Sequence, residues 1–185
     1  MAFVAKWSEA AIPPHPCWTR RYKQNRFSAL VAMIPVRQPE GPYLSFRSNA
    51  SGRHATVEDD GYSAWLYLTR QTKYEVVVTV FVYSRVELPE FKVMPFGKNG
   101  PPLLLRQFGT AVAVQKQVPE AALRIKFSHD GNAAVVFLRG EPWAFVVYDQ
   151  MRGHSKSISK SGPFGMPWDE QLFREYFPDL DAANL

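Results

Sequence analysis

The sequence predicts an α+β protein dominated by a mainly antiparallel, strongly curled β-sheet, with a C-terminal helix packed on that sheet. Residues 61–88 and 123–149 are rich in valine and aromatic residues, which fit a pleated surface and lose rotamer freedom in a helix. Residues 167–177 instead place aromatic side chains at helical spacing. We expect about six to eight strands, and a partial barrel is the alternative to an open curled sheet.

The strongest β signal, residues 61–88, predicts an antiparallel hairpin. Residues 63–69 form its first strand and residues 74–86 its second, and the short polar stretch 70–73 joins them. Pro89 ends the second strand, because proline has no amide hydrogen to donate to the ladder.

The second strand of this hairpin is apolar on both faces. Val78 and Val80 point to one face, and Phe81 and Tyr83 point to the other, since successive strand residues alternate. This pattern indicates a central strand rather than an edge strand. We expect the C-terminal helix to cover one face, and closure of the sheet, proline-rich loops or another subunit to cover the other.

The N-terminal part of the chain predicts less regular structure. Residues 1–26 are expected to be an irregular lead-in, because closely spaced prolines exclude a helix interior. Residues 27–36 are a predicted strand, and residues 38–42 have the composition of a turn. Residues 43–48 alternate as a strand, whereas the polar residues 49–61 predict a loop or a weak hairpin.

The middle of the chain predicts a second antiparallel region. Residues 110–118 are a predicted strand, and Pro119 suits the start of a short helical turn over 119–122. The strands that follow form a meander, with an Asp-Gly turn over 129–132 that uses the positive φ that glycine tolerates. Its strands are residues 123–128, 133–139 and 143–149.

The C-terminal region predicts a connection and then a helix. Residues 152–163 are dominated by serine, glycine and lysine, which predicts a flexible loop. Residues 167–177 predict a helix, with Pro167 in its first turn and Asp169 and Glu170 near the positive end of its dipole. The apolar face of this helix carries Trp168, Leu172, Phe173, Tyr176 and Phe177.

Length and composition indicate one domain over all 185 residues. Cys17 is the single cysteine, so no internal disulfide can form. No apolar run approaches the ~20 residues that span a bilayer, and the N-terminus does not have the pattern of a secretory signal. We therefore expect a cytoplasmic protein that does not contact membrane. The formal net charge of +5 favours solubility and weak affinity for anionic partners.

Motifs that carry catalysis or bind cofactors do not stand out in this sequence. Neither a phosphate-binding loop nor a nucleophile elbow is present. Cys17 follows His15 closely, but a structural zinc site needs a second pair of ligands, and the remaining histidines are isolated. We expect no metal site, no cofactor and no catalytic residue that the sequence can identify, and we interpret Cys17 as a packing residue.

Two basic segments are the candidate sites for an anion or a nucleic acid. Residues 18–27 interleave cations, which neutralise phosphates, with rings, which stack on bases. The simpler interpretation is a solvated segment anchored by its rings. The candidate contact residues there are Arg20, Arg21, Lys23 and Arg26, with Trp18, Tyr22 and Phe27 as stacking residues. In the serine-rich segment the candidates are Arg152, His154, Lys156 and Lys160, and the simpler interpretation is a flexible linker.

Three functional hypotheses follow. The first is a non-enzymatic binding protein, such as a small inhibitor, an immunity-type protein or an adaptor, which docks another protein or forms a homo-oligomer through a sheet face or edge. The second is a nucleic-acid binder that uses residues 18–27. The third is an enzyme whose site assembles only in three dimensions, in a sheet-end cleft that holds some of His54, His129, Asp130 and His154.

Overall fold

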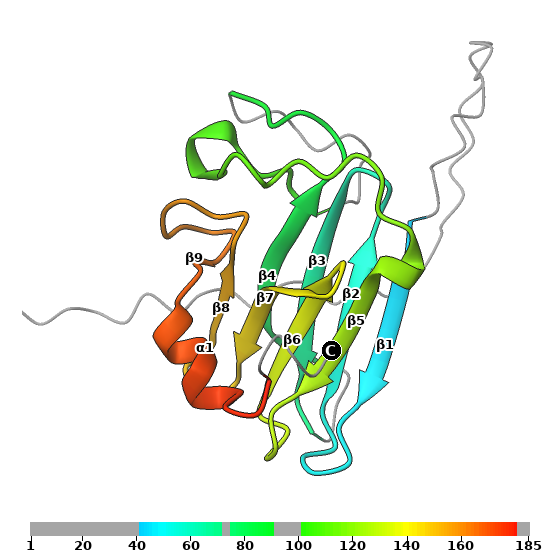
Figure 1. Cartoon of the computed structure of the whole chain (residues 1–185), viewed down its shortest axis with the longest axis vertical. Coiled ribbons are helices and arrows are strands. Elements are labelled where there is room, and N and C mark those ends of the chain that lie inside the picture. The colour runs from blue at the N-terminus through cyan, green and yellow to red at the C-terminus, as the bar shows by residue number, and fades with distance from the viewer. Residues whose placement is uncertain (1–40, 72–74, 91–100, 181–185) are drawn as a thin grey trace, which may run out of the picture. The chain divides into compact units, whose positions relative to one another are not determined.

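A computed structural model describes residues 41–71, 75–90 and 101–180 (Figure 1). Contacts divide the chain into residues 1–34 and 35–185, and all described residues belong to the second unit. The irregular lead-in predicted for residues 1–26 and the strand predicted for residues 27–36 lie outside the described residues. The single domain predicted for the whole chain stays a prediction.

The first sheet holds four antiparallel strands in chain order. They are β1 (Tyr43–Arg47), β2 (His54–Asp59), β3 (Ser63–Thr69) and β4 (Val76–Ser84). The predicted hairpin over residues 61–88 is therefore confirmed as β3 and β4. β2 lies in the polar stretch that the sequence analysis assigned to a loop or a weak hairpin.

Strand β2 is hidden in the sequence because its outward residues are strongly polar. Ala55 and Val57 are completely buried, whereas the alternating residues Thr56 and Glu58 are not. The acidic and glycine residues that follow β2 resemble a loop by composition, yet Asp59 belongs to the strand and is buried. The period-2 alternation, rather than the composition, is the signal that marks this strand.

The second sheet holds five strands in chain order. They are β5 (Leu123–Phe127), β6 (Ala133–Leu138), β7 (Glu141–Val147), β8 (Arg152–Ser155) and β9 (Met166–Pro167). The first four pair antiparallel, so the predicted three-stranded meander is confirmed as β5 to β7 and is extended by β8. β9 pairs parallel to β8.

The inner faces of the two sheets share one apolar core. Val78 and Val80 of β4 belong to the same buried cluster as Val136 of β6 and Val146 of β7. Gly153 of β8 permits a close approach, because a Cβ atom there would lie 2.5 Å from the Cβ of Val80. The second sheet, and not the helix, therefore covers the first apolar face of β4.

The described strands do not form the strongly curled sheet or partial barrel that the sequence analysis predicts. They form two separate sheets, and neither closes on itself. Alternation along a strand shows that each face is buried or exposed, but it does not show whether the covering layer belongs to the same sheet. The β-dominated α+β class with mostly antiparallel strands is confirmed.

Strand β4 is the last strand of its sheet, so the prediction of a central strand is wrong. Its outer edge is covered by irregular segments of the chain. The amide of Phe81 donates to the Phe164 carbonyl at 3.0 Å, and the amide of Ser84 donates to the Ala113 carbonyl at 2.8 Å. Phe81 and Tyr83, on the second face of β4, belong to the same buried cluster as Phe164 of this covering segment.

The predicted strand over residues 110–118 is also not formed. Val114 makes only an isolated bridge to Ser84, and the preceding 3₁₀ turn is Arg106–Phe108. The short helical turn predicted after Pro119 is confirmed as the 3₁₀ turn Glu120–Ala122.

Helix α1 (Glu170–Tyr176) lies on the outer face of the second sheet (Figure 1). It begins later than predicted, because Pro167 belongs to β9 and the side chain of Asp169 caps the helix by accepting a bond from the Leu172 amide. The buried rings of Phe173 and Phe177 pack against Phe145 of β7. The predicted docking of the aromatic face is confirmed, but on the second sheet.

The first half of the predicted flexible loop, residues 152–158, is instead a strand followed by a buried turn, whereas residues 159–163 are exposed. Residues 152–155 are strand β8, and Ser155, Ser157 and Ile158 are buried. The Trp143 indole N–H donates to the Ser157 hydroxyl at 3.1 Å, and this hydroxyl donates to the Val82 carbonyl. Serine here satisfies buried polar groups at the contact between the sheets, which composition cannot reveal. No helix among the described residues is long and apolar enough to cross a membrane.

Candidate functional site

The first predicted basic segment, residues 18–27, lies outside the described residues. The contact and stacking residues proposed there therefore remain predictions. The charge of the chain is nevertheless informative, because residues 1–40 supply most of the formal net charge of +5. The basic residues there are Lys6, Arg20, Arg21, Lys23, Arg26 and Arg37, against Glu9 and Glu40.

The second predicted basic set is spread over different surroundings. Arg152 and His154 occupy alternate positions of β8, but Arg152 is exposed whereas His154 is buried. The ammonium of Lys156 lies 5.3 Å from the Trp168 ring centroid, whereas that of Lys160 lies 4.9 Å from the Phe108 ring centroid. These two lysines therefore contact different aromatic residues.

His154 lies under the C-terminal part of the chain. Its ring stacks on Phe145 at a centroid distance of 4.9 Å and an interplanar angle of 8°. Nδ1 lies 2.9 Å from the Pro167 carbonyl, which makes it the donor, whereas Nε2 is buried without a hydrogen-bond partner among the described residues. This geometry suits a packing residue rather than an anion contact.

A buried polar network lies at one end of the first sheet. The carboxylate of Asp59 accepts bonds from the Tyr83 hydroxyl at 2.6 Å and from Arg85 Nε at 2.7 Å. Burial, and then the bond to Asp59, raise the pKa of the Tyr83 phenol. Arg85 also donates to the Val118 carbonyl at 2.9 Å. The groups of this network are occupied by one another, so we interpret it as structural.

The three described histidines lie on different elements and belong to no described group that could hold a metal ion. His54 lies on β2, His129 in the turn before β6, and His154 on β8. Within residues 41–71, 75–90 and 101–180, no group of three or more histidine, cysteine, aspartate or glutamate side chains could hold a metal ion. Asp130, the carboxylate next to His129, instead accepts bonds from Ser128 and Asn132.

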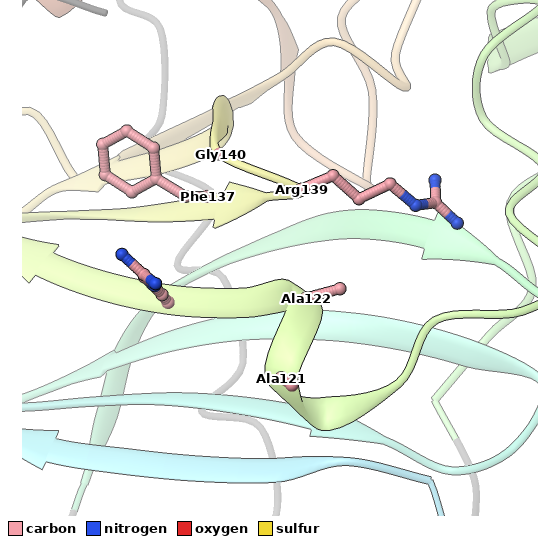
Figure 2. A pocket seen from close by; sticks show the side chains of 6 residues that line it. Ala121, Ala122, Phe137, Arg139 and Gly140 are labelled. Atoms are coloured by element: carbon pink, nitrogen blue, oxygen red, sulfur yellow. The ribbon is translucent and has the colours of Figure 1, made fainter. Parts of the chain in front are cut away.

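One surface depression, of about 250 Å³, lies where β5 and β6 meet the turns at their ends (Figure 2). The side chain of Arg139 extends away from the Phe137 ring in this view. Arg139 donates to Gln115 Oε1 at 2.6 Å and to the Gln117 carbonyl at 2.8 Å. Its guanidinium is thus directed to the neighbouring segment rather than to a ligand in the depression. The lining residues are Ala121, Ala122, Arg124, Phe137, Arg139 and Gly140.

Strand β1 carries two of the five exposed large apolar side chains among the described residues. It lies at the end of its sheet, and no described strand pairs with it on the side away from β2. Tyr43 and Phe46 are 62% and 50% exposed, although they point to opposite faces. A soluble domain usually shortens, charges or covers such an edge, because it is a template for pairing with another chain.

The hydrogen bonds of β1 show which main-chain groups face outward. The Asp59 amide donates to the Pro42 carbonyl at 3.0 Å, and the Ser48 amide donates to the Arg53 carbonyl at 2.8 Å. Even-numbered residues of β1 therefore direct their amides and carbonyls to β2, because these directions alternate in an antiparallel pair. The odd-numbered residues Tyr43, Ser45 and Arg47 direct theirs away from β2.

Comparisons with protein-family models, with curated proteins and with solved structures find no match for this chain. The candidate site therefore depends on the geometry of this chain alone. The alternation of residues 43–48 predicts a strand, but it does not predict that this strand lies at a sheet edge. No signal in the sequence marks this edge, because aromatic residues on both faces of a strand suit a central strand equally well.

Proposed function

We propose that the chain is a non-enzymatic interaction protein that docks an extended segment of a partner protein along β1. The observation that supports this proposal is the exposure of Tyr43 and Phe46 on a strand that ends its sheet. Strand addition to such an edge gives affinity through main-chain hydrogen bonds and specificity through alternate side chains. Small inhibitors, immunity-type proteins and adaptors belong to this functional class.

The partner segment must offer an extended backbone and an alternating pattern. Its main chain would bond to the outward groups of Tyr43, Ser45 and Arg47, which a five-residue strand presents on one side. A residue placed beside Phe46 should be apolar, whereas a residue placed beside Tyr43 can be cationic, because cations bind the faces of aromatic rings.

Selection from a random-peptide display library tests this function. We expect wild-type protein to enrich peptides with β-forming residues and an alternating pattern. Ser45→Pro should abolish their binding, because it removes an outward amide from the edge. Ser45→Ala is the matched control, because it keeps the amide and loses only the hydroxyl that lies 2.9 Å from Thr56 Oγ1. Peptides that bind the proline variant equally well would contradict this assignment of the edge.

A second candidate function is nucleic-acid binding by residues 18–27. The concentration of positive charge in residues 1–40 favours it, because binding to phosphates depends on local rather than average charge. Arg20, Arg21 and Lys23 would neutralise phosphates, and Trp18 or Tyr22 would stack on bases.

Fluorescence anisotropy with labelled single-stranded RNA and DNA tests this second candidate. We expect affinity that falls steeply with salt, and a triple Arg20→Ala, Arg21→Ala, Lys23→Ala variant that binds at least ~10-fold more weakly. The matched control removes two basic residues of β5 and one of the β6–β7 turn. It carries Arg124→Ala, Lys126→Ala and Arg139→Ala. Equal losses in both variants would indicate unspecific attraction and would count against residues 18–27.

A further inference from the structure

The edge formed by β1 is complementary to itself. When a second copy of β1 pairs antiparallel with its centre on Ser45, the outward main-chain groups of the two strands face each other. Ser45 then lies opposite the second Ser45, and Tyr43 lies opposite the second Arg47. Each of these facing pairs exchanges two main-chain hydrogen bonds, so the strands would share about six in total.

The side chains in this register also match. On the outer face, each Tyr43 ring meets the Arg47 guanidinium of the other copy, which is a favourable cation–aromatic pair. On the inner face, the half-exposed Phe46 meets the partly buried Leu44 of the other copy. Both exposed rings of β1 thus gain a complementary neighbour from one symmetry operation, as a two-fold interface requires.

Charge supports the same register. Glu58 of β2 lies directly beside Tyr43 in the sheet, and the pKa of its carboxyl is raised, first by burial and then by the neighbouring Asp60. The Arg47 of a second copy would place a cation on the other side of Tyr43, where it reduces this negative potential. Arg47 is free to reorient, because its bond to the Gly52 carbonyl is 3.4 Å long and exposed.

We propose that the partner of β1 is a second copy of this chain, paired antiparallel about Ser45 so that two four-stranded sheets become one continuous sheet. This assignment rests on the proposed function, because it names the occupant of the same edge. Pairing of two five-residue strands buries less surface than a permanent dimer needs. The dimer is therefore in equilibrium with the monomer and forms as concentration rises.

Analytical ultracentrifugation of the full chain over a hundredfold concentration range tests the dimer. Wild-type protein and Ser45→Ala should both shift from monomer to dimer. Ser45→Pro should remain monomeric, with an unchanged circular dichroism spectrum to show that it folds. A chain that stays monomeric throughout overturns the proposal. The same result is expected if another segment of the chain already occupies the edge of β1. A dimer that persists in Ser45→Pro also overturns it, because another surface must then hold the copies together.

Cysteine cross-linking tests the register without a variant that weakens the strand. In a Cys17→Ser background, Ser45→Cys places two thiols on the two-fold axis, with Cα atoms about 5.5 Å apart, which is within the range of a disulfide. Thr56→Cys is the matched control on β2, one strand further from the axis. We expect a covalent dimer for Ser45→Cys at least ~10-fold faster than for Thr56→Cys. Equal rates overturn the register.

These outcomes separate the second-copy assignment from the proposed function. A monomeric protein that binds selected peptides through β1 overturns only the second-copy assignment. A monomeric protein that also selects no peptides overturns both.

Discussion

The guanidinium carbon of Arg53 lies 3.3 Å from the centroid of the Tyr148 ring. Arg53 is buried, and its Nε donates to Asn132 Oδ1 at 3.1 Å. One arginine thus connects the start of β2 in the first sheet to two turns of the second sheet. Because the planar guanidinium stacks and donates at the same time, lysine cannot replace it.

We predict that Arg53→Lys lowers the free energy of unfolding by about 2 kcal/mol, through loss of the stacked cation and of a buried hydrogen bond. Tyr148→Leu should cost a similar amount, and the double variant should cost less than the sum, because the two residues share one interaction. Urea denaturation measures all three. Arg70→Ala, which removes an exposed ion pair to Glu75, is the control and should change stability by less than ~0.5 kcal/mol. Additive costs would contradict the stacking.

The free energy of unfolding should fall at alkaline pH, because folding keeps two tyrosines from ionising. Burial is the first cause that raises the pKa of Tyr83 and of Tyr67, with the bond to Asp59 second for Tyr83 and the charge of Glu58 second for Tyr67. Unfolded tyrosines lose their protons near pH 10, whereas the folded chain keeps these protons to higher pH. The folded state therefore binds more protons, and its stability decreases as pH rises above about 10.

Urea denaturation between pH 8 and pH 11 checks this prediction, with the range set by the ordinary tyrosine pKa of about 10. Tyr83→Phe should lower stability at pH 8 by about 1 kcal/mol, through loss of a buried hydrogen bond, and should make the alkaline decline shallower. Tyr43→Phe is the control, because Tyr43 is 62% exposed. A decline that is equally steep in Tyr83→Phe would show that Tyr83 does not contribute to it.

Two glycines with positive φ allow the free-energy cost of backbone strain to be measured apart from the cost of steric crowding. Gly131 has φ +73°, and a Cβ there would lie 2.1 Å from Ser48 Oγ, whereas Gly140 has φ +84° and open space around it. Gly140→Ala should cost about 1–2 kcal/mol, the cost of the left-handed conformation. Gly131→Ala should cost more, because it also displaces the Ser48 loop from the β5–β6 turn. Equal losses in thermal denaturation would show that this loop adapts without cost.

The aromatic face of α1 should contribute strongly to stability. Phe173 is 4% exposed, and its ring centroid lies 4.9 Å from that of Trp168 and 5.8 Å from that of Phe145. Phe173→Ala should lower the free energy of unfolding by about 3–5 kcal/mol. The exposed Glu175→Ala should change it by less than ~0.5 kcal/mol. Denaturation followed by far-UV circular dichroism compares the two, and similar values would mean that α1 does not depend on this packing.

Much of the local structure could be predicted from neighbouring residues. The hairpin of β3 and β4, the meander of β5 to β7 and the aromatic face of α1 follow from alternation or helical spacing within short segments. The elements that the sequence predicted wrongly depend on contacts outside their own segment. Strand β8 and the buried Ser157 have the composition of a loop, but β8 pairs with β7, and the Ser157 hydroxyl is bonded to Trp143 and to the distant Val82 carbonyl.

The candidate site at β1 could likewise be predicted only in part. Residues 43–48 are recognisable as a strand from Leu44 and Phe46, yet the sequence does not show that this strand ends a sheet. It also predicts β4 as central, because Phe81 and Tyr83 are apolar on its second face, whereas Phe164 and Ala113 cover the open edge of β4. Whether a strand lies at an edge depends on whether another segment of the chain pairs with its second side, and the residues within the strand do not show this.

The sequence alone is enough to predict the β-dominated class, the β3–β4 hairpin, the meander of β5 to β7 and the aromatic face of α1, because each of these depends on patterns within one short segment. Only the tertiary structure decided that there are two sheets, that α1 covers the second one, and that β1 carries exposed rings at an edge. These features depend on how distant segments pack. A buried face in the sequence has the same alternating pattern whichever layer covers it.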